Sequence, residues 1–153
     1  MSDGLNEGVV GDTAKLMFHR LIVRMLRRDP SLRERAKAAH ARQAEQFAGW
    51  PFVREWQDLL DLPLGELVSK LISRDREMVR LRNTSPFYLA EGVDLGDYDA
   101  RVRLRRAARR IVKRAVHATS SSEVDERNDG ATDSAVGSTT NTQLTVLPTK
   151  LLK

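Results

Sequence analysis

The chain has 153 residues, 41% of them hydrophobic and 5% aromatic, which is enough for one domain with a modest core. Cysteine is absent, which excludes disulfides and thiolate metal sites. The formal net charge is +5, and arginine supplies 20 of the 26 basic residues.

The sequence contains no candidate for a membrane span or a secretory leader. Its most apolar stretch, Leu16 to Leu26, is interrupted by charged residues and is shorter than the roughly 20 apolar residues that cross a bilayer. The first eleven residues are acidic and glycine-rich, unlike a leader peptide. We therefore expect a cytoplasmic protein that does not bind membranes.

Residues 1–11 are expected to form a flexible arm, after which Asp12 or Thr13 caps a first helix that ends near Arg28. Apolar residues recur along this helix at helical spacing. The opposite face carries a secondary basic strip, Arg20, Arg24 and Arg27. Pro30 then begins a second helix, about Ser31 to Ala48, which Gly49 ends.

The middle of the chain predicts three shorter helices. Pro51 opens one, residues 61–73 form the next, and Ser73 or Asp75 caps the third. Half of the aromatic residues lie where the second and third helices meet, and we expect them to be buried there: Phe47, Trp50, Phe52 and Trp56. Residues 83–99 read as a loop, because Pro86, Gly92 and Gly96 interrupt any helical period.

The last predicted helix, residues 100–118, has eight basic residues and no acid. Its apolar residues share one arc, so the helix can be packed on a core and still present cations. The candidate binding residues are Arg101, Arg103, Arg106, Arg109, Arg110, Lys113 and Arg114. A solvated face that offsets the acidic middle section, a nucleic-acid phosphate backbone and an acidic protein partner remain alternative interpretations.

Residues 119–153 are rich in serine, threonine and asparagine and are predicted to be a disordered tail. The fold class expected is therefore all-α: a single compact bundle of about six helices over residues 12–118. The apolar face of the first helix could be core or the contact of a dimer.

No motif for catalysis or metal binding is evident, so we expect neither enzymatic activity nor a cofactor. The three histidines are isolated in sequence and are expected to be surface or half-buried residues. The acidic loop that contains Glu91 and Asp99 lacks the ligand spacing of a calcium loop.

Residues 55–87 resemble a stretch of small helical antitoxin proteins from bacterial toxin–antitoxin gene pairs. The shared features are a tryptophan before a double leucine, then a proline and two further leucines. An ending of the form Leu-Arg-x-x-Ser/Thr-Pro-Phe completes them, and here it comprises residues 81–87. After this point the chain departs from the pattern, since its final helix is arginine-rich and lacks tryptophan.

The resemblance implies a protein that binds and neutralises a partner, and the basic last helix suggests contact with DNA as well. The alternative is a stand-alone basic nucleic-acid-binding protein. A second alternative is a structural or phage-type assembly protein, which would form a large defined oligomer.

Overall fold

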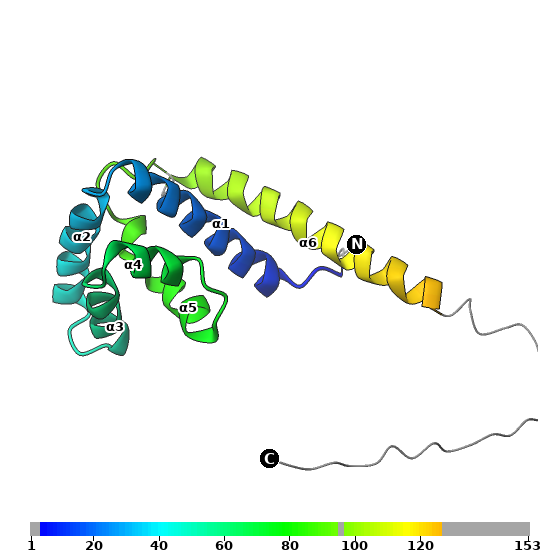
Figure 1. The fold of residues 1–153 in the computed structure, drawn as a ribbon, viewed down its shortest axis with the longest axis horizontal. Helices are drawn as coiled ribbons and strands as arrows, with labels where there is room; N and C mark the ends of the chain where they lie inside the picture. The colour runs from blue at the N-terminus through cyan, green and yellow to red at the C-terminus, as the bar shows by residue number, and fades with distance from the viewer. Residues whose placement is uncertain (1–3, 95–96, 127–153) are drawn as a thin grey trace, which may run out of the picture.

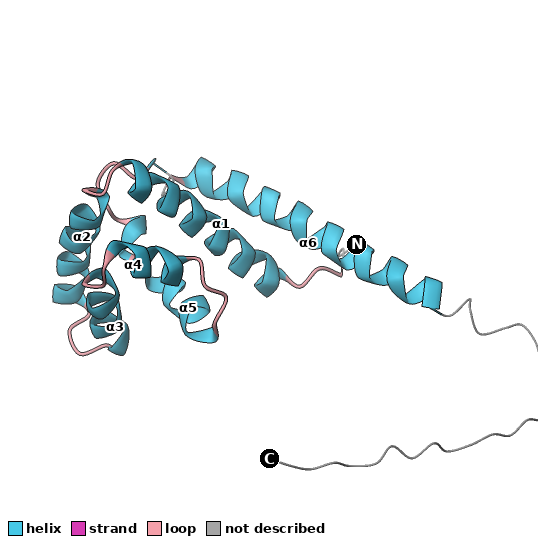
Figure 2. Ribbon diagram, viewed as in Figure 1, coloured by secondary structure: helices cyan, strands magenta, loops and turns pink. Residues whose placement is uncertain are grey.

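The computed structural model describes residues 4–94 and 97–126, with side chains described to residue 121. Every regular element in this range is helical, which confirms the predicted all-α class (Figure 2). The elements are α1 (Glu7–Arg28), α2 (Leu32–Gln46), α3 (Pro51–Leu60), α4 (Leu64–Leu71), α5 (Arg76–Leu81), the short 3₁₀ helices η1 (Arg82–Thr84) and η2 (Pro86–Tyr88), and α6 (Tyr98–Glu126).

Helix α1 begins earlier than the sequence predicted, so the arm proposed for residues 1–11 is wrong for residues 7–11. The Asn6 side chain caps the helix by accepting hydrogen bonds from the backbone amides of Gly8 and Val9, at 2.9 and 3.3 Å. Thr13, expected near the start, is inside the helix, where its hydroxyl donates to the Val9 carbonyl. The sequence did not predict this start because Gly8 and Gly11 lie in the first turns, and glycine is a poor helix former.

The shorter helices follow the prediction with small differences. Helix α4 starts at Leu64 instead of residue 61, directly after Pro63, which is the residue at its N-cap. Helix α5 is capped by Asp75, whose carboxylate accepts a hydrogen bond from the Met78 amide at 2.9 Å. The same carboxylate accepts from the Ser73 hydroxyl, and these bonds lower the pKa of Asp75.

Helix α6 is longer than the predicted range of 100–118. The hydroxyls of Thr119, Ser120 and Ser121 donate to backbone carbonyls one turn earlier, so these polar residues are accommodated within a helix. The prediction of disorder is therefore wrong for residues 119–121. Residues 127–153 of the predicted tail lie outside the described residues.

The helices form two unequal groups on either side of α1. Figure 1 shows α2 to α5 gathered at one side, whereas α6 runs antiparallel to α1 and extends past its N-terminal end. The main core lies between α1 and the short helices. Its largest fully buried apolar side chains are Phe18, Ile22, Leu26, Leu32, Trp56, Leu60, Leu67, Leu71 and Phe87.

The aromatic residues near the α2–α3 junction are only partly buried, which corrects the prediction of a common core. Trp56 is fully buried and donates from Nε1 to the Leu81 carbonyl at 3.2 Å. Trp50 is 61% exposed and Phe47 36% exposed. Trp50 occupies the N-cap of α3, just before Pro51, where its backbone is extended.

Within the described part of the chain, no helix combines the length and the apolarity needed to cross a membrane.

Candidate functional site

The contact between α1 and α6 has a small apolar centre and an ionic edge. Val10, Ala108 and Val112 are buried at the centre, apart from the main core. At the edge, the Glu7 carboxylate accepts hydrogen bonds from Arg105, at 2.8 Å, and from Arg109, at 2.5 Å. These two bonds lower the pKa of Glu7, so it stays charged at neutral pH.

The face of α6 opposite this contact carries a line of exposed arginines, which we call the cationic stripe: Arg103, Arg106, Arg110 and Arg114. Spacings of three and four residues place them along one side of the helix. None of the four forms an ion pair with another described residue. Over eleven residues the stripe is about 16 Å long.

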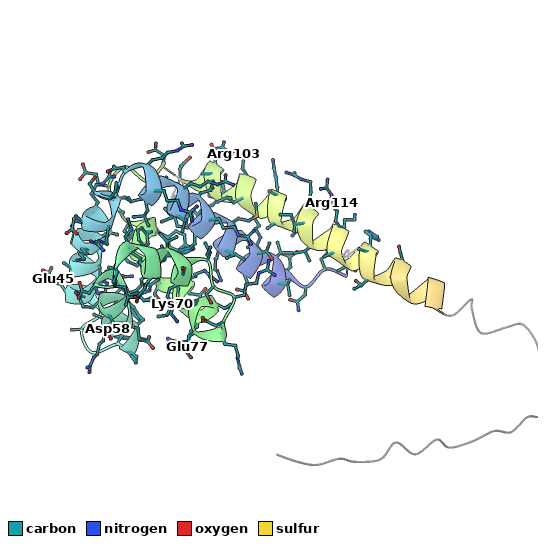
Figure 3. All side chains as sticks on the ribbon, in the orientation of Figure 1. Glu45, Asp58, Lys70, Glu77, Arg103 and Arg114 are labelled. Carbon is teal, nitrogen blue, oxygen red and sulfur yellow. The ribbon has the colours of Figure 1, made fainter. Side chains whose placement is uncertain are left out.

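Figure 3 labels charged side chains on both sides of the fold. Arg103 and Arg114 lie on the side of α6 that faces away from the short helices, whereas Glu45, Asp58 and Glu77 lie on α2, α3 and α5, on the other side of α1. The stripe therefore lies on the other side of the fold from these three acids, and its four arginines are exposed to solvent. A solvated face that offsets the acidic middle section stays an alternative, because one of those acids, Asp99, lies in the first turn of α6.

The other candidate residues on α6 have different surroundings. Arg109 is paired with Glu7, and Lys113 is exposed. Arg101 lies toward α1, beside Tyr88. Arg105 was not among the predicted residues, although it makes the second bond to Glu7. Arg105 and Arg109 lie on the side of α6 that contacts α1, and the sequence of α6 alone does not show which side that is.

The secondary basic strip on α1 is exposed as predicted. Arg20, Arg24 and Arg27 lie along one face of the helix and form no ion pair with a described residue. Arg20 lines an open groove of about 660 Å³ between α1 and α6. Three exposed apolar side chains also line this groove, namely Val9, Ile111 and Val116.

A second cavity, of about 400 Å³, lies where α1, α6 and the 3₁₀ helices meet. Its floor is apolar and includes Phe18 and Leu104. Its polar lining consists of Lys15, Arg82, Asn83, Tyr88, Arg101 and Arg105. No acidic side chain is among the residues that line it.

Comparison of the chain with protein-family models, with curated protein sequences and with solved structures finds no match. The site must therefore be interpreted from its own geometry.

The residues that carry the antitoxin resemblance have packing roles in this fold. The Arg82 side chain is 2% exposed and donates to the carbonyls of Leu71 and Ser73 at the end of α4. The buried Ser85 hydroxyl lies 2.9 Å from Nε2 of His19. Phe87 packs edge-on against Trp56. Five of the seven residues 81–87 are therefore buried in the core, whereas Asn83 is exposed and Thr84 is half-buried.

The histidines differ from the expectation of surface or half-buried residues. His19 and His40 are buried, and only His117 is exposed. Burial lowers the pKa of His19 to about 4, which leaves the ring neutral between the Lys15 carbonyl and Ser85. Over residues 4–94 and 97–126, no three histidine, aspartate or glutamate side chains come close enough together to hold a metal ion.

Proposed function

We propose that the protein binds double-stranded nucleic acid through the cationic stripe of α6. The observation that carries the proposal is the set of four arginines, Arg103, Arg106, Arg110 and Arg114, aligned on the outward face without acidic partners. Such a row suits a regular line of phosphates, because each guanidinium can form two parallel hydrogen bonds with phosphate oxygens.

The composition of the stripe favours contact with the phosphate backbone. Between Arg103 and Arg114 the helix contains no aromatic residue on which an unpaired base could stack, and no asparagine or glutamine that could read the edge of an adenine. Backbone contacts position a protein on a duplex but carry little sequence information. We therefore expect duplex binding with weak sequence preference.

Binding of a fluorescently labelled DNA duplex, measured by anisotropy at low salt, tests this function. In the stripe variant Arg103, Arg106, Arg110 and Arg114 are all changed to glutamine. The control variant changes four exposed cations outside α6 to glutamine, Arg42, Arg54, Lys70 and Arg76, so both variants lose the same net charge. We expect the stripe variant to lose nearly all binding and the control to retain most of it. Equal losses would contradict the proposal.

An antitoxin-like role, in which the protein also neutralises a partner protein, stays a prediction supported by the resemblance of residues 55–87. A pull-down of the tagged protein from its native host, with and without nuclease, tests it. A small protein that is captured stoichiometrically after nuclease treatment would support the role. Capture of nucleic acid alone would leave the stand-alone nucleic-acid-binding protein as the better description.

A further inference from the structure

The cavity between α1, α6 and the 3₁₀ helices is lined by positive charges that have no role in the proposed function. Cations from three separate segments converge on it: Lys15 from α1, Arg82 from η1, and Arg101 and Arg105 from α6. Like charges that converge on one cavity repel each other, and the repulsion is reduced when an anion binds between them.

Two of these cations form ion pairs with acidic side chains outside the cavity. Lys15 pairs with Asp12 at 3.4 Å, and Arg105 pairs with Glu7 at 2.8 Å, but neither acid lines the cavity. Arg82 and Arg101 have no carboxylate partner among the described residues. Arg82 is held rigidly, since it is 2% exposed and bonded to two backbone carbonyls. The two cations of the cavity that form no ion pair with a described carboxylate are therefore Arg82 and Arg101.

The apolar floor limits the kind of anion that fits. Phe18 stacks on Tyr88 with ring centroids 4.4 Å apart, and Leu104 lies beside them. The volume of about 400 Å³ is within the usual range for small-molecule sites and leaves room for more than an inorganic ion. Gly11 keeps one wall open, because a Cβ there would have no neighbouring heavy atom within 4 Å outside its own helix.

We propose that this cavity binds a small organic anion, with a phosphate or carboxylate group between Arg82 and Arg101 and an apolar body on Phe18 and Leu104. Asn83 and the Tyr88 hydroxyl lie in the same lining and can donate further hydrogen bonds. The site is distinct from the cationic stripe, which is on the opposite face of α6, so the two can be tested separately.

The test is a titration followed by backbone-amide NMR, with four probes: phenyl phosphate, benzoate, inorganic phosphate and the uncharged benzyl alcohol. We expect phenyl phosphate or benzoate to bind more tightly than the last two, with the largest shifts at Gly11, Asn83 and Leu104. The tighter of the first two identifies the anionic group. Failure of both to bind, or equally tight binding of benzyl alcohol, would overturn the proposal.

Two variants with matched controls locate the site. Arg101→Gln should weaken binding at least about tenfold, while Arg103→Gln, on the opposite face of α6, should leave it unchanged. Gly11→Leu fills the cavity without altering any charge and should abolish binding, whereas Gly65→Leu, at an equally open helical position in α4, should not. Circular dichroism and the melting temperature check that each variant is folded. Equal effects within either pair would contradict the assignment.

Discussion

The Arg82 side chain donates hydrogen bonds from Nε and Nη2 to the Leu71 carbonyl, at 3.2 and 2.9 Å, and so caps the C-terminal end of α4 from within the core. A cation near a helix C-terminus is favoured by the helix dipole as well as by these bonds. The contact joins η1 to α4, although α5 lies between them in the sequence. Arg82 also lines the proposed anion cavity.

Replacing Arg82 by methionine should destabilise the fold markedly. The substitution leaves the buried carbonyl of Leu71 without a donor and removes charged hydrogen bonds, with an expected loss of about 2–3 kcal/mol in the free energy of unfolding. Urea denaturation followed by circular dichroism measures it. The exposed Arg76→Met, at the start of α5, is the control and should change stability by less than about 0.5 kcal/mol. Similar values for both variants would show that the buried contact is unimportant.

The buried His19 should make stability depend on pH below neutrality. Its pKa is about 4 in the folded chain and 6.5 when unperturbed, so the unfolded chain binds the proton more readily. The free energy of unfolding should therefore be at its full value above about pH 6.5. It should fall as the pH drops toward 4, by at most ~1.4 kcal/mol per pH unit. Denaturation curves between pH 7 and pH 5, above the range of most carboxylates, measure the slope in wild type and in His19→Gln. A slope that persists unchanged in the variant would rule out His19 as its source.

The start of α1 at Asn6 can be tested directly. Asn6→Ala removes the acceptor for the first amides of the helix and should cost about 1 kcal/mol. Thr13→Ala, at the start that the sequence suggested, should cost much less, because a hydroxyl bonded to the preceding turn contributes little within a helix. Thermal denaturation of both variants compares them, and a larger effect at Thr13 would indicate that the helix begins later than described.

Two glycine substitutions should have opposite signs. Gly11→Ala should stabilise the fold by up to about 1 kcal/mol, since alanine is the better helix former and its methyl group meets no neighbour. Gly92→Ala should destabilise it, because Gly92 has φ of +80° and a Cβ there would lie 2.7 Å from Nη1 of Arg35. The melting temperatures of the two variants should therefore move in opposite directions, and a shift of both in the same direction would contradict the backbone described here.

Much of the helical plan could be predicted from spacing and caps, whereas tertiary placement could not. Asp75 as a cap and Pro51 as the first residue of α3 follow from local rules, and both are confirmed. The exposure of Trp50 and the burial of Arg82 are set by the path of the chain between helices. Each reverses what the residue type usually indicates.

The sequence predicted a basic face on the last helix, but not which of its arginines are free of ion pairs. The period of α6 identified a basic face, and four of its predicted residues form the stripe: Arg103, Arg106, Arg110 and Arg114. The sequence could not separate these from Arg109, because the partner that neutralises Arg109 is Glu7, which lies 102 residues earlier in the sequence. The proposed anion cavity has no local signal at all, since its cations come from three segments.

The sequence leaves open whether the apolar face of the first helix is core or a dimer contact, and the structure buries Phe18, Ile22 and Leu26 of that face in the main core. Light scattering over a range of protein concentrations tests for a dimer. The exposed Val9, Ile111 and Val116 of the open groove are the apolar contact that a second copy would cover. A dimer through this groove would give a mass that rises with concentration toward two chains in the wild type, but not in Ile111→Glu combined with Val116→Glu. A constant mass of one chain would exclude the dimer. A large defined oligomer would favour the assembly-protein alternative instead.

The salt dependence of duplex binding tests the proposed function most directly. If each stripe arginine neutralises one phosphate, the slope of log K against log salt concentration should be less steep in the stripe variant than in wild type by about 3 to 4. The control variant, Arg42, Arg54, Lys70 and Arg76 to glutamine, should keep the wild-type slope. Equal slopes for wild type and the stripe variant would contradict the account, because Arg103, Arg106, Arg110 and Arg114 would then make no phosphate contact.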